Sequence, residues 1–136
     1  MKYTQLKEET KKEFDAFPFS FAFSDEQFKE GKKKLGVENN NELADIGNGG
    51  FMKKTDIKRF KELVEKQHRR LKKFLEDDNQ MLEAFTYELA NHEYGYNEDY
   101  EPTLDCFGLK FEELTEREER ILKQARVKYF EEADDF

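Results

Sequence analysis

The sequence is poor in the residues that build disulfides, metal sites and membrane spans. It contains one cysteine, two histidines and two prolines in 136 residues. Cys106 therefore cannot form an intramolecular disulfide, which fits a reducing compartment. No stretch approaches the ~20 apolar residues of a transmembrane helix, and the first residues, MKYTQLKEETKKEF, are too polar for a signal peptide. We therefore expect a cytoplasmic protein with no membrane contact.

The few residues that could support metal binding or catalysis are poorly spaced for it. Four candidate ligands share one short span: His92, Glu93, Asp99 and Asp105. Their order is not that of a zinc motif, and His68 lies among arginines that would repel a cation. Cys106 has no His or Cys close by in sequence and no neighbouring base. The sequence thus predicts no metal, no cofactor and no catalytic residue, and His92 is interpreted as a helix-end hydrogen-bonding residue.

Charge is abundant and strongly segregated. Charged residues make up 41% of the chain and its net charge is −8. Residues 1–52 sum to −2, residues 53–73 to +7 and residues 74–136 to −13. Such composition alone would favour disorder, but fourteen Phe and six Tyr can bury ~150–250 Å² each and argue for a folded core. Segregated charge also suggests partners, or head-to-tail or two-fold self-association as a homodimer.

The most basic segment is predicted to be one long amphipathic helix over residues 53–76. Thr55 is a suitable N-cap, and Ile57, Phe60 and Val64 begin an apolar stripe with helical spacing. Six cations on the outer face are candidate partner-binding residues: Lys58, Arg59, Lys66, Arg69, Arg70 and Lys73. Three interpretations stay open, namely a solvated face paired with acids, a phosphate-facing surface, and contact with an acidic protein.

The segments before this helix predict a small α+β region. A polar helix over residues 4–16 precedes alternating Phe at 17–23, interpreted as a core strand because basic neighbours for an aromatic platform are lacking. Ser24 and Gln27 form a capping box for a helix that ends at Gly36. A glycine-rich turn then leads to a short strand, Gly50–Lys53, that pairs with residues 19–23. The alternative for this turn is anion contact by four residues: Gly47, Gly49, Gly50 and Lys53.

The second half is predicted to be helical and acidic. Asn79 is expected to cap a helix over residues 80–94 that packs antiparallel to the basic helix and forms the main core. An acidic, tyrosine-rich connector follows, with Phe111 and Leu114 as anchors. Thr115 and Glu118 form a second capping box, and the acidic tail, residues 131–136, should fray. We expect a mostly helical α+β fold in a single domain with frayed ends, having four to five helices and a two- or three-stranded antiparallel sheet.

Three segments carry a resemblance to a known group of proteins. They are residues 17–28 (FPFSFAFSDEQF), residues 46–51 (IGNGGF) and residues 88–94 (ELANHEY), the last followed by TLD at 103–105 and GL at 108–109. The chain resembles small acidic proteins of phages and mobile elements of gut bacteria. It is similar to an anti-CRISPR family that inhibits type II-A Cas9. The resemblance covers roughly residues 14–114.

The resemblance implies a stoichiometric inhibitor in the bacterial host cell, acting by host-defence evasion rather than as an enzyme. Its partner would be Cas9 or another host-defence nuclease complex, including its guide RNA, and it would block DNA binding or cleavage. Independently of the resemblance, the acidity of the second half suggests carboxylates that imitate phosphates, and Glu98, Asp99 and Glu101 join the cations of the basic helix as candidate contacts. The alternative is a nucleic-acid-binding accessory protein of a mobile element that uses the basic helix, although the overall acidity opposes it.

Overall fold

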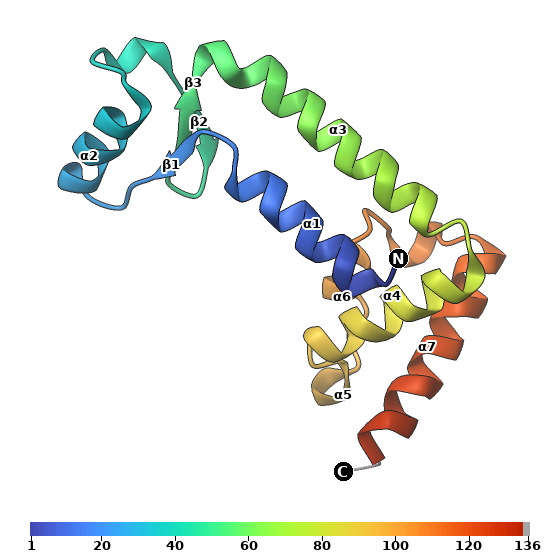
Figure 1. Ribbon diagram of the computed structural model, residues 1–136. Helices are drawn as coiled ribbons and strands as arrows, with labels where there is room; N and C mark the ends of the chain where they lie inside the picture. Colours follow the sequence, from blue (N-terminus) through green and yellow to red (C-terminus); the bar gives the residue numbers. More distant parts are fainter. Residues whose placement is uncertain (135–136) are drawn as a thin grey trace. The chain divides into compact units, whose positions relative to one another are not determined.

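The computed structural model describes residues 1–134, and these fall into two compact units (Figure 1). Unit 1 comprises residues 1–6 together with the chain from residue 69 onward, and unit 2 comprises residues 7–68. Helices α1 (Tyr3–Asp15) and α3 (Ile57–Phe74) each contribute to both units. The mostly helical α+β fold is confirmed, with five helices of eleven or more residues and two short ones among the described residues. The expectation of a single domain stays a prediction.

Unit 2 is built on a three-stranded antiparallel sheet of strand order β1-β3-β2. The strands are β1 (Phe19–Phe21), β2 (Leu43–Gly47) and β3 (Gly50–Lys53). Phe19 faces Met52 across the β1–β3 pair, which confirms the predicted pairing. Asn48 and Gly49, with φ of 53° and 80°, form the two-residue turn between β2 and β3. Positive φ at both central residues is typical of a hairpin turn.

Helix α2 (Asp25–Leu35) covers the sheet of unit 2, and its predicted caps are confirmed. The Ser24 Oγ accepts from the Gln27 amide at 3.2 Å, and Gly36 ends the helix with a φ of 73°. Gly31 is buried, and a Cβ at this position would lie 2.6 Å from the ring of Phe51. A glycine therefore lets the helix lie close to the sheet. Leu35, Val37 and Phe51 form the small core, and a short 3-10 turn, Asn40–Glu42, precedes β2.

The alternating phenylalanines are less buried than a core strand requires. Phe19 is half-buried, Phe21 is 45% exposed, and Phe23 lies beyond the strand with 78% of its surface exposed. The prediction of a core strand is therefore wrong for the outer phenylalanines. β1 is an edge strand, and Phe19 instead contacts Phe14 and Phe17, with ring centroids 4.5 and 6.1 Å apart.

Helix α3 lies within the predicted basic helix, residues 53–76, but it is shorter, with 18 residues, and it begins differently. A 3-10 turn, Lys54–Asp56, precedes it, so Thr55 lies inside that turn and does not cap the helix. Only Phe74 is fully buried, whereas Phe60, Leu63 and Val64 are half-buried. Within unit 2, Lys66 pairs with Glu13 at 3.1 Å, and Gln67 donates to the Thr10 carbonyl of α1. The polar contacts thus fix α3 against α1.

Unit 1 has its main core between α4 (Asp78–Asn91) and α7 (Glu116–Asp134). The α4 cap is Asp77, whose carboxylate accepts from the Gln80 amide at 3.0 Å, so the expected Asn79 cap is wrong. The prediction that the basic helix and α4 form the main core is wrong too, because α7 packs against α4 there. Residues 69–74 of α3 belong to unit 1, where Phe74 packs with Tyr3, Leu6 and Ala84.

Helix α7 carries the second capping box as predicted. The Thr115 Oγ1 accepts from the Glu118 amide at 3.1 Å, and the Glu118 carboxylate accepts from the Thr115 amide at 2.9 Å. Ile121, Leu122 and Ala125 are buried on one face of the helix. The helix includes residues 131–134, and the remainder of the tail predicted to fray, residues 135–136, lies outside the described residues.

The connector between α4 and α7 folds into short helical turns, α5 (Tyr94–Asn97), α6 (Glu101–Asp105) and the 3-10 turn Phe111–Glu113. Glu93 and Glu98 have φ of 53° and 55°, so the chain turns sharply at each end of α5. Phe111 is 56% exposed, which corrects its predicted role as a buried anchor. None of the helices described combines the length and the apolar character that a membrane span requires.

Candidate functional site

Unit 1 carries a groove that brings the predicted acidic contact residues together. It has a volume of about 460 Å³ and is formed by α6, the residues before it and the 3-10 turn. Leu104, Leu109, Tyr100 and Phe111 supply its apolar part, and the last two rings stack with centroids 5.8 Å apart and planes 7° apart. The charged residues of the lining are Glu98, Asp99, Glu101, Asp105, Lys110 and Glu112. Five carboxylates against one amine make the groove strongly negative.

Local hydrogen bonds of the backbone position these acids. The Asn97 side chain accepts from the Asp99 amide at 3.1 Å, and the Asp99 carboxylate accepts from the Glu101 amide at 3.0 Å. Pro102 follows in the first turn of α6, where its fixed φ suits the start of a helix. These contacts place three neighbouring acids on the rim of one groove. The sequence predicted these residues but not the groove that they share.

The rim is held to α7 by one arginine. Arg126 donates to Glu98 at 2.6 Å and to the Tyr94 hydroxyl at 3.1 Å. Tyr94 in turn stacks on Tyr100, with centroids 4.7 Å apart. The pKa of Tyr100 is raised above its ordinary value, mainly by burial and secondly by a hydrogen bond with Tyr94. Glu98 therefore has an internal cation, whereas Asp99 and Glu101 are exposed and face solvent.

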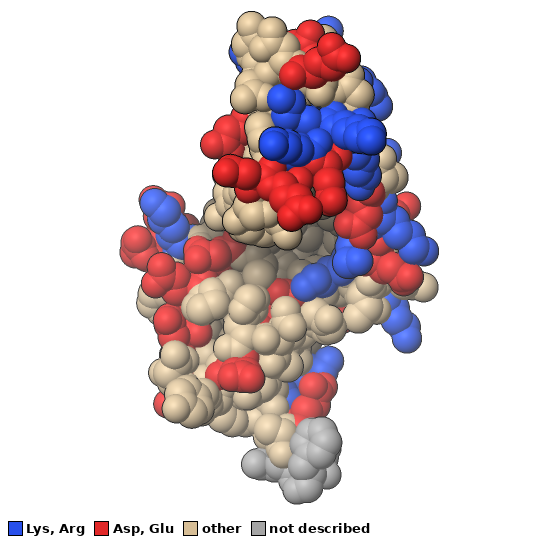
Figure 2. Space-filling view, turned by 90° about the vertical axis from the view of Figure 1, so that its left-hand side faces the viewer, with Lys and Arg blue, Asp and Glu red and all other residues tan. Residues whose placement is uncertain are grey.

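The six cations of the basic helix all lie on α3, but several already contact the protein. Lys66 pairs with Glu13, and Arg59 pairs with Asp56 at 3.2 Å while lying over the ring of Phe17 at 5.6 Å. Arg70 is half-buried and also has a partner. Lys58, Arg69 and Lys73 are exposed. On the face seen in Figure 2, groups of Lys and Arg side chains lie directly beside groups of Asp and Glu side chains.

The glycine-rich turn forms a hairpin rather than an anion cradle. The Asp45 carboxylate accepts from the Gly47 amide at 2.7 Å, and Gly50 is buried within β3. Lys53 is the last residue of β3, and α3 begins only at Ile57. The turn is therefore not at a helix N-terminus. The predicted turn and strand are confirmed, and the geometry adds no support for anion contact.

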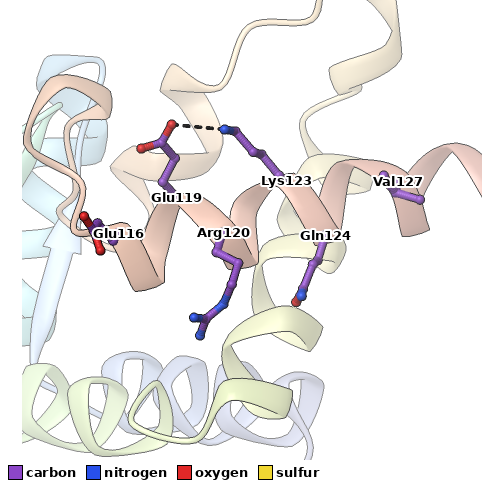
Figure 3. A pocket seen from close by; sticks show the side chains of 6 residues that line it. All are labelled: Glu116, Glu119, Arg120, Lys123, Gln124 and Val127. Carbon is purple, nitrogen blue, oxygen red and sulfur yellow. Dashed lines mark ion pairs between the residues drawn. The ribbon is translucent and has the colours of Figure 1, made fainter.

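A second hollow, of about 520 Å³, lies along α7 alone (Figure 3). Lys123 pairs with Glu119 at 3.3 Å, and Arg120 projects to the opposite side of the helix from this pair. The lining residues are Glu116, Glu119, Arg120, Lys123, Gln124 and Val127. Because one helix supplies them all and they diverge, this hollow offers no converging set of groups for a ligand.

The structure also assembles a cluster that the sequence did not predict. Although Cys106 has no histidine close by in sequence, it lies beside one in the structure. Its Sγ is 3.2 Å from His92 Nε2 and 2.9 Å from Glu88 Oε2. The predicted neighbours Glu93, Asp99 and Asp105 do not belong to this cluster. Glu88 and His92 are four residues apart, a spacing that puts both on one helix face and could have suggested the pair. No sequence pattern signals that Cys106 joins them.

The chain belongs to a family of unknown function, DUF7659, whose sequence profile matches residues 2–132. The match includes both units, the acidic groove and the Glu88–His92–Cys106 cluster. The comparisons with curated proteins and with solved structures give no match.

Proposed function

We propose that this protein acts stoichiometrically by binding a basic protein surface through the acidic groove of unit 1. The observation that carries the proposal is the set of carboxylates around a stacked aromatic pair, Tyr100 and Phe111. An arginine side chain matches both parts of such a groove. Its guanidinium stacks on aromatic faces and donates paired hydrogen bonds to carboxylates.

The specific form of this proposal is an anti-CRISPR-type inhibitor of a Cas9–guide nuclease. Cas9 holds its guide and DNA in positively charged channels, and arginines read the short motif at which DNA first docks. Carboxylates spaced along a narrow rim, such as Asp99 and Glu101, can occupy positions that phosphates take in such a channel. The resemblance of residues 14–114 to a family of Cas9 inhibitors supports the same target.

The test is DNA cleavage by a panel of Cas9–guide complexes, with this protein added either before or after the target DNA. If the groove occupies the DNA-docking surface, inhibition is expected only when the protein is added first. Equal inhibition in both orders would instead indicate that cleavage, not DNA binding, is blocked. No inhibition by any complex of the panel, even at large excess, would refute the anti-CRISPR form of the proposal.

Matched variants test whether the acidic groove is the surface that contacts the Cas9–guide complex. Glu101→Gln with Glu112→Gln removes two groove charges and keeps side-chain size, and we expect the inhibitor to weaken by tenfold or more. The control is Glu26→Gln with Glu30→Gln, which removes the same charge from exposed positions of α2. An equal loss in both double variants would show that net charge, and not the groove, governs inhibition.

Nucleic-acid binding by α3 is the alternative, and it makes a separable prediction. A surface that makes six to ten phosphate contacts loses affinity by several decades as salt rises from ~50 to ~200 mM. Arg59 and Lys66 already pair with carboxylates, and the net charge of −8 opposes approach to nucleic acid. Steep, salt-dependent binding to naked RNA or DNA, lost in Lys58→Gln with Lys73→Gln, would establish this alternative instead.

A further inference from the structure

Three different ligand types converge at the junction of α4 and α6. Glu88 lies in the last turn of α4, His92 is its C-cap, and Cys106 is the C-cap of α6. His92 Nε2 is 3.3 Å from Glu88 Oε2 and 3.2 Å from Cys106 Sγ, and that sulfur is 2.9 Å from the same carboxylate oxygen. Cys106 also approaches the Pro102 carbonyl, at 3.4 Å. The Glu88 side chain is buried, with 1% exposed, whereas that of His92 is 34% exposed.

The arrangement differs from a nucleophile activated by a histidine. In a catalytic triad one imidazole nitrogen faces the nucleophile and the other faces the carboxylate that orients the ring. Here the same nitrogen, Nε2 of His92, faces both the thiol and the carboxylate. The three donor atoms therefore form a close triangle instead of a relay. A close triangle of nitrogen, oxygen and sulfur donors can coordinate one ion.

We propose that Glu88, His92 and Cys106 form a binding site for a divalent transition metal of the Zn²⁺ class. The three contact distances describe a triangle whose corners lie about 1.8 Å from its centre. Zn–N, Zn–O and Zn–S bonds measure ~2.0–2.3 Å, so an ion about 1 Å out of the plane reaches all three atoms. That position leaves a fourth direction for water or an added ligand.

The donor set selects the class of metal. Thiolate and imidazole suit Zn²⁺ and Co²⁺, whereas Mg²⁺ and Ca²⁺ prefer sites made of oxygen atoms alone. On binding, the thiol proton of Cys106 passes to the buffer and the sulfur bonds to the ion as thiolate, with no change of oxidation state. Entry is open, because Cys106 is exposed at the surface of unit 1.

A bound ion would also fasten a loop. His92 and Cys106 are 14 residues apart, and the segment between them contains α5, α6 and the sharp turns at Glu93 and Glu98. Because the ion binds the folded chain and not the unfolded chain, its binding free energy adds to the free energy of unfolding. At a hundredfold excess over the dissociation constant, the Tm should rise by on the order of 5–10 °C.

The test is titration of the full, reduced, metal-free chain with Co²⁺, followed by displacement with Zn²⁺. Thiolate-bound Co²⁺ gives a near-ultraviolet charge-transfer band, and tetrahedral Co²⁺ gives strong visible bands. Since Cys106 is the single cysteine, the charge-transfer band reports this residue alone. We expect one ion per chain, with a dissociation constant for Zn²⁺ on the order of micromolar or tighter.

Variants separate the site from adventitious binding. Cys106→Ser should remove the charge-transfer band, and His92→Gln should weaken Zn²⁺ binding by tenfold or more. The matched controls are His68→Gln on α3 and Glu93→Gln, neither of which should change affinity. No charge-transfer band, a dissociation constant weaker than ~1 mM, or an equal effect of His68→Gln would overturn the proposal.

A measurement on the chain without substitutions tests the site even if the variants fail to fold. The rate of alkylation of Cys106 by iodoacetamide should fall by tenfold or more when one equivalent of Zn²⁺ is present, and a chelator should restore it. An unchanged rate, with the fold intact by circular dichroism, would show that the sulfur is not a ligand. This readout requires no inhibitory or enzymatic activity, so it succeeds or fails separately from the proposed function.

Discussion

Arg117 joins three elements of unit 1, and its removal should cost more stability than its exposure suggests. Its Nε donates to Asp78 at 2.6 Å, and its Nη2 donates to the carbonyls of Leu75 and Glu76 at 2.8 and 2.9 Å. These carbonyls follow the C-terminus of α3, where unpaired backbone acceptors and the helix dipole favour a cation. Arg120 contacts the same Asp78, but only at 3.4 Å.

The two arginines make a matched pair for Arg117→Met and Arg120→Met, which both keep an apolar stem. A hydrogen bond from a charged group contributes ~1.5–3 kcal/mol when buried. The Arg117 side chain is 35% exposed, and water can replace part of its contacts. We therefore expect about 2–3 kcal/mol lost from the free energy of unfolding. For Arg120, 59% exposed, we expect at most ~0.5 kcal/mol.

Urea denaturation followed by tyrosine circular dichroism measures this difference in unit 1 alone. All six tyrosines lie in unit 1 and the chain has no tryptophan, so the tyrosine band, measured at wavelengths beyond the phenylalanine bands, does not report unit 2. The midpoint should fall in Arg117→Met without a change in the slope of free energy against urea. Equal losses in the two variants would refute the reasoning, because they would make the carbonyl contacts of Arg117 irrelevant.

Two further perturbations test packing in unit 2 and ionisation in unit 1. Gly31→Ala gains helix propensity but puts a methyl group 2.6 Å from the ring of Phe51, so we expect a net loss of about 1–2 kcal/mol by calorimetry. The neighbouring, exposed Glu30→Ala should stay within ~0.5 kcal/mol, and a stabilised Gly31→Ala would contradict the close packing. Because burial raises the pKa of Tyr100 above its usual value near 10, the fold favours the neutral phenol. Its contribution is therefore complete below pH ~10 and declines as the pH rises further. Tyr100→Phe should remove that part of alkaline destabilisation, and an unchanged pH profile would rule it out.

Sequence patterns correctly predicted those parts of the fold that depend on contacts between residues close in sequence. The caps at Ser24 and Thr115 join residues three positions apart, so the sequence contains the whole interaction. The cap of α4 was misplaced because Asp77 and Asn79 are equally suitable by residue type, and only the path of the chain selects Asp77. The partner of α4 could not be predicted either. Both the basic helix and α7 offer apolar faces with helical spacing, and 24 residues separate the end of α4 at Asn91 from the start of α7 at Glu116.

Of the two candidate sites, the acidic groove could be predicted in part from the sequence, whereas the metal cluster could not. Glu98, Asp99 and Glu101 were predicted as contacts from charge alone, and their nearness in sequence makes a shared rim unsurprising. The meeting of Cys106 with Glu88 depends on a separation of 18 residues. That separation is bridged through turns with positive φ at two glutamates, a conformation that residue type does not predict for Glu. A lone cysteine distant from any histidine in sequence gave no signal.

The acidic groove and the metal cluster share one segment of chain, and this links the two proposals. Residues 93–105 begin after His92, end before Cys106, and contain Glu98, Asp99 and Glu101. An ion that fastens the ends of this segment lowers the conformational entropy that a partner must otherwise remove when it binds the rim. Linkage then requires the reverse effect as well, so a basic partner in the groove should tighten Zn²⁺ binding by the same factor as Zn²⁺ tightens the partner. If both ligands bind but their affinities are independent, the segment is already rigid without the metal, and the cluster contributes to stability rather than to recognition.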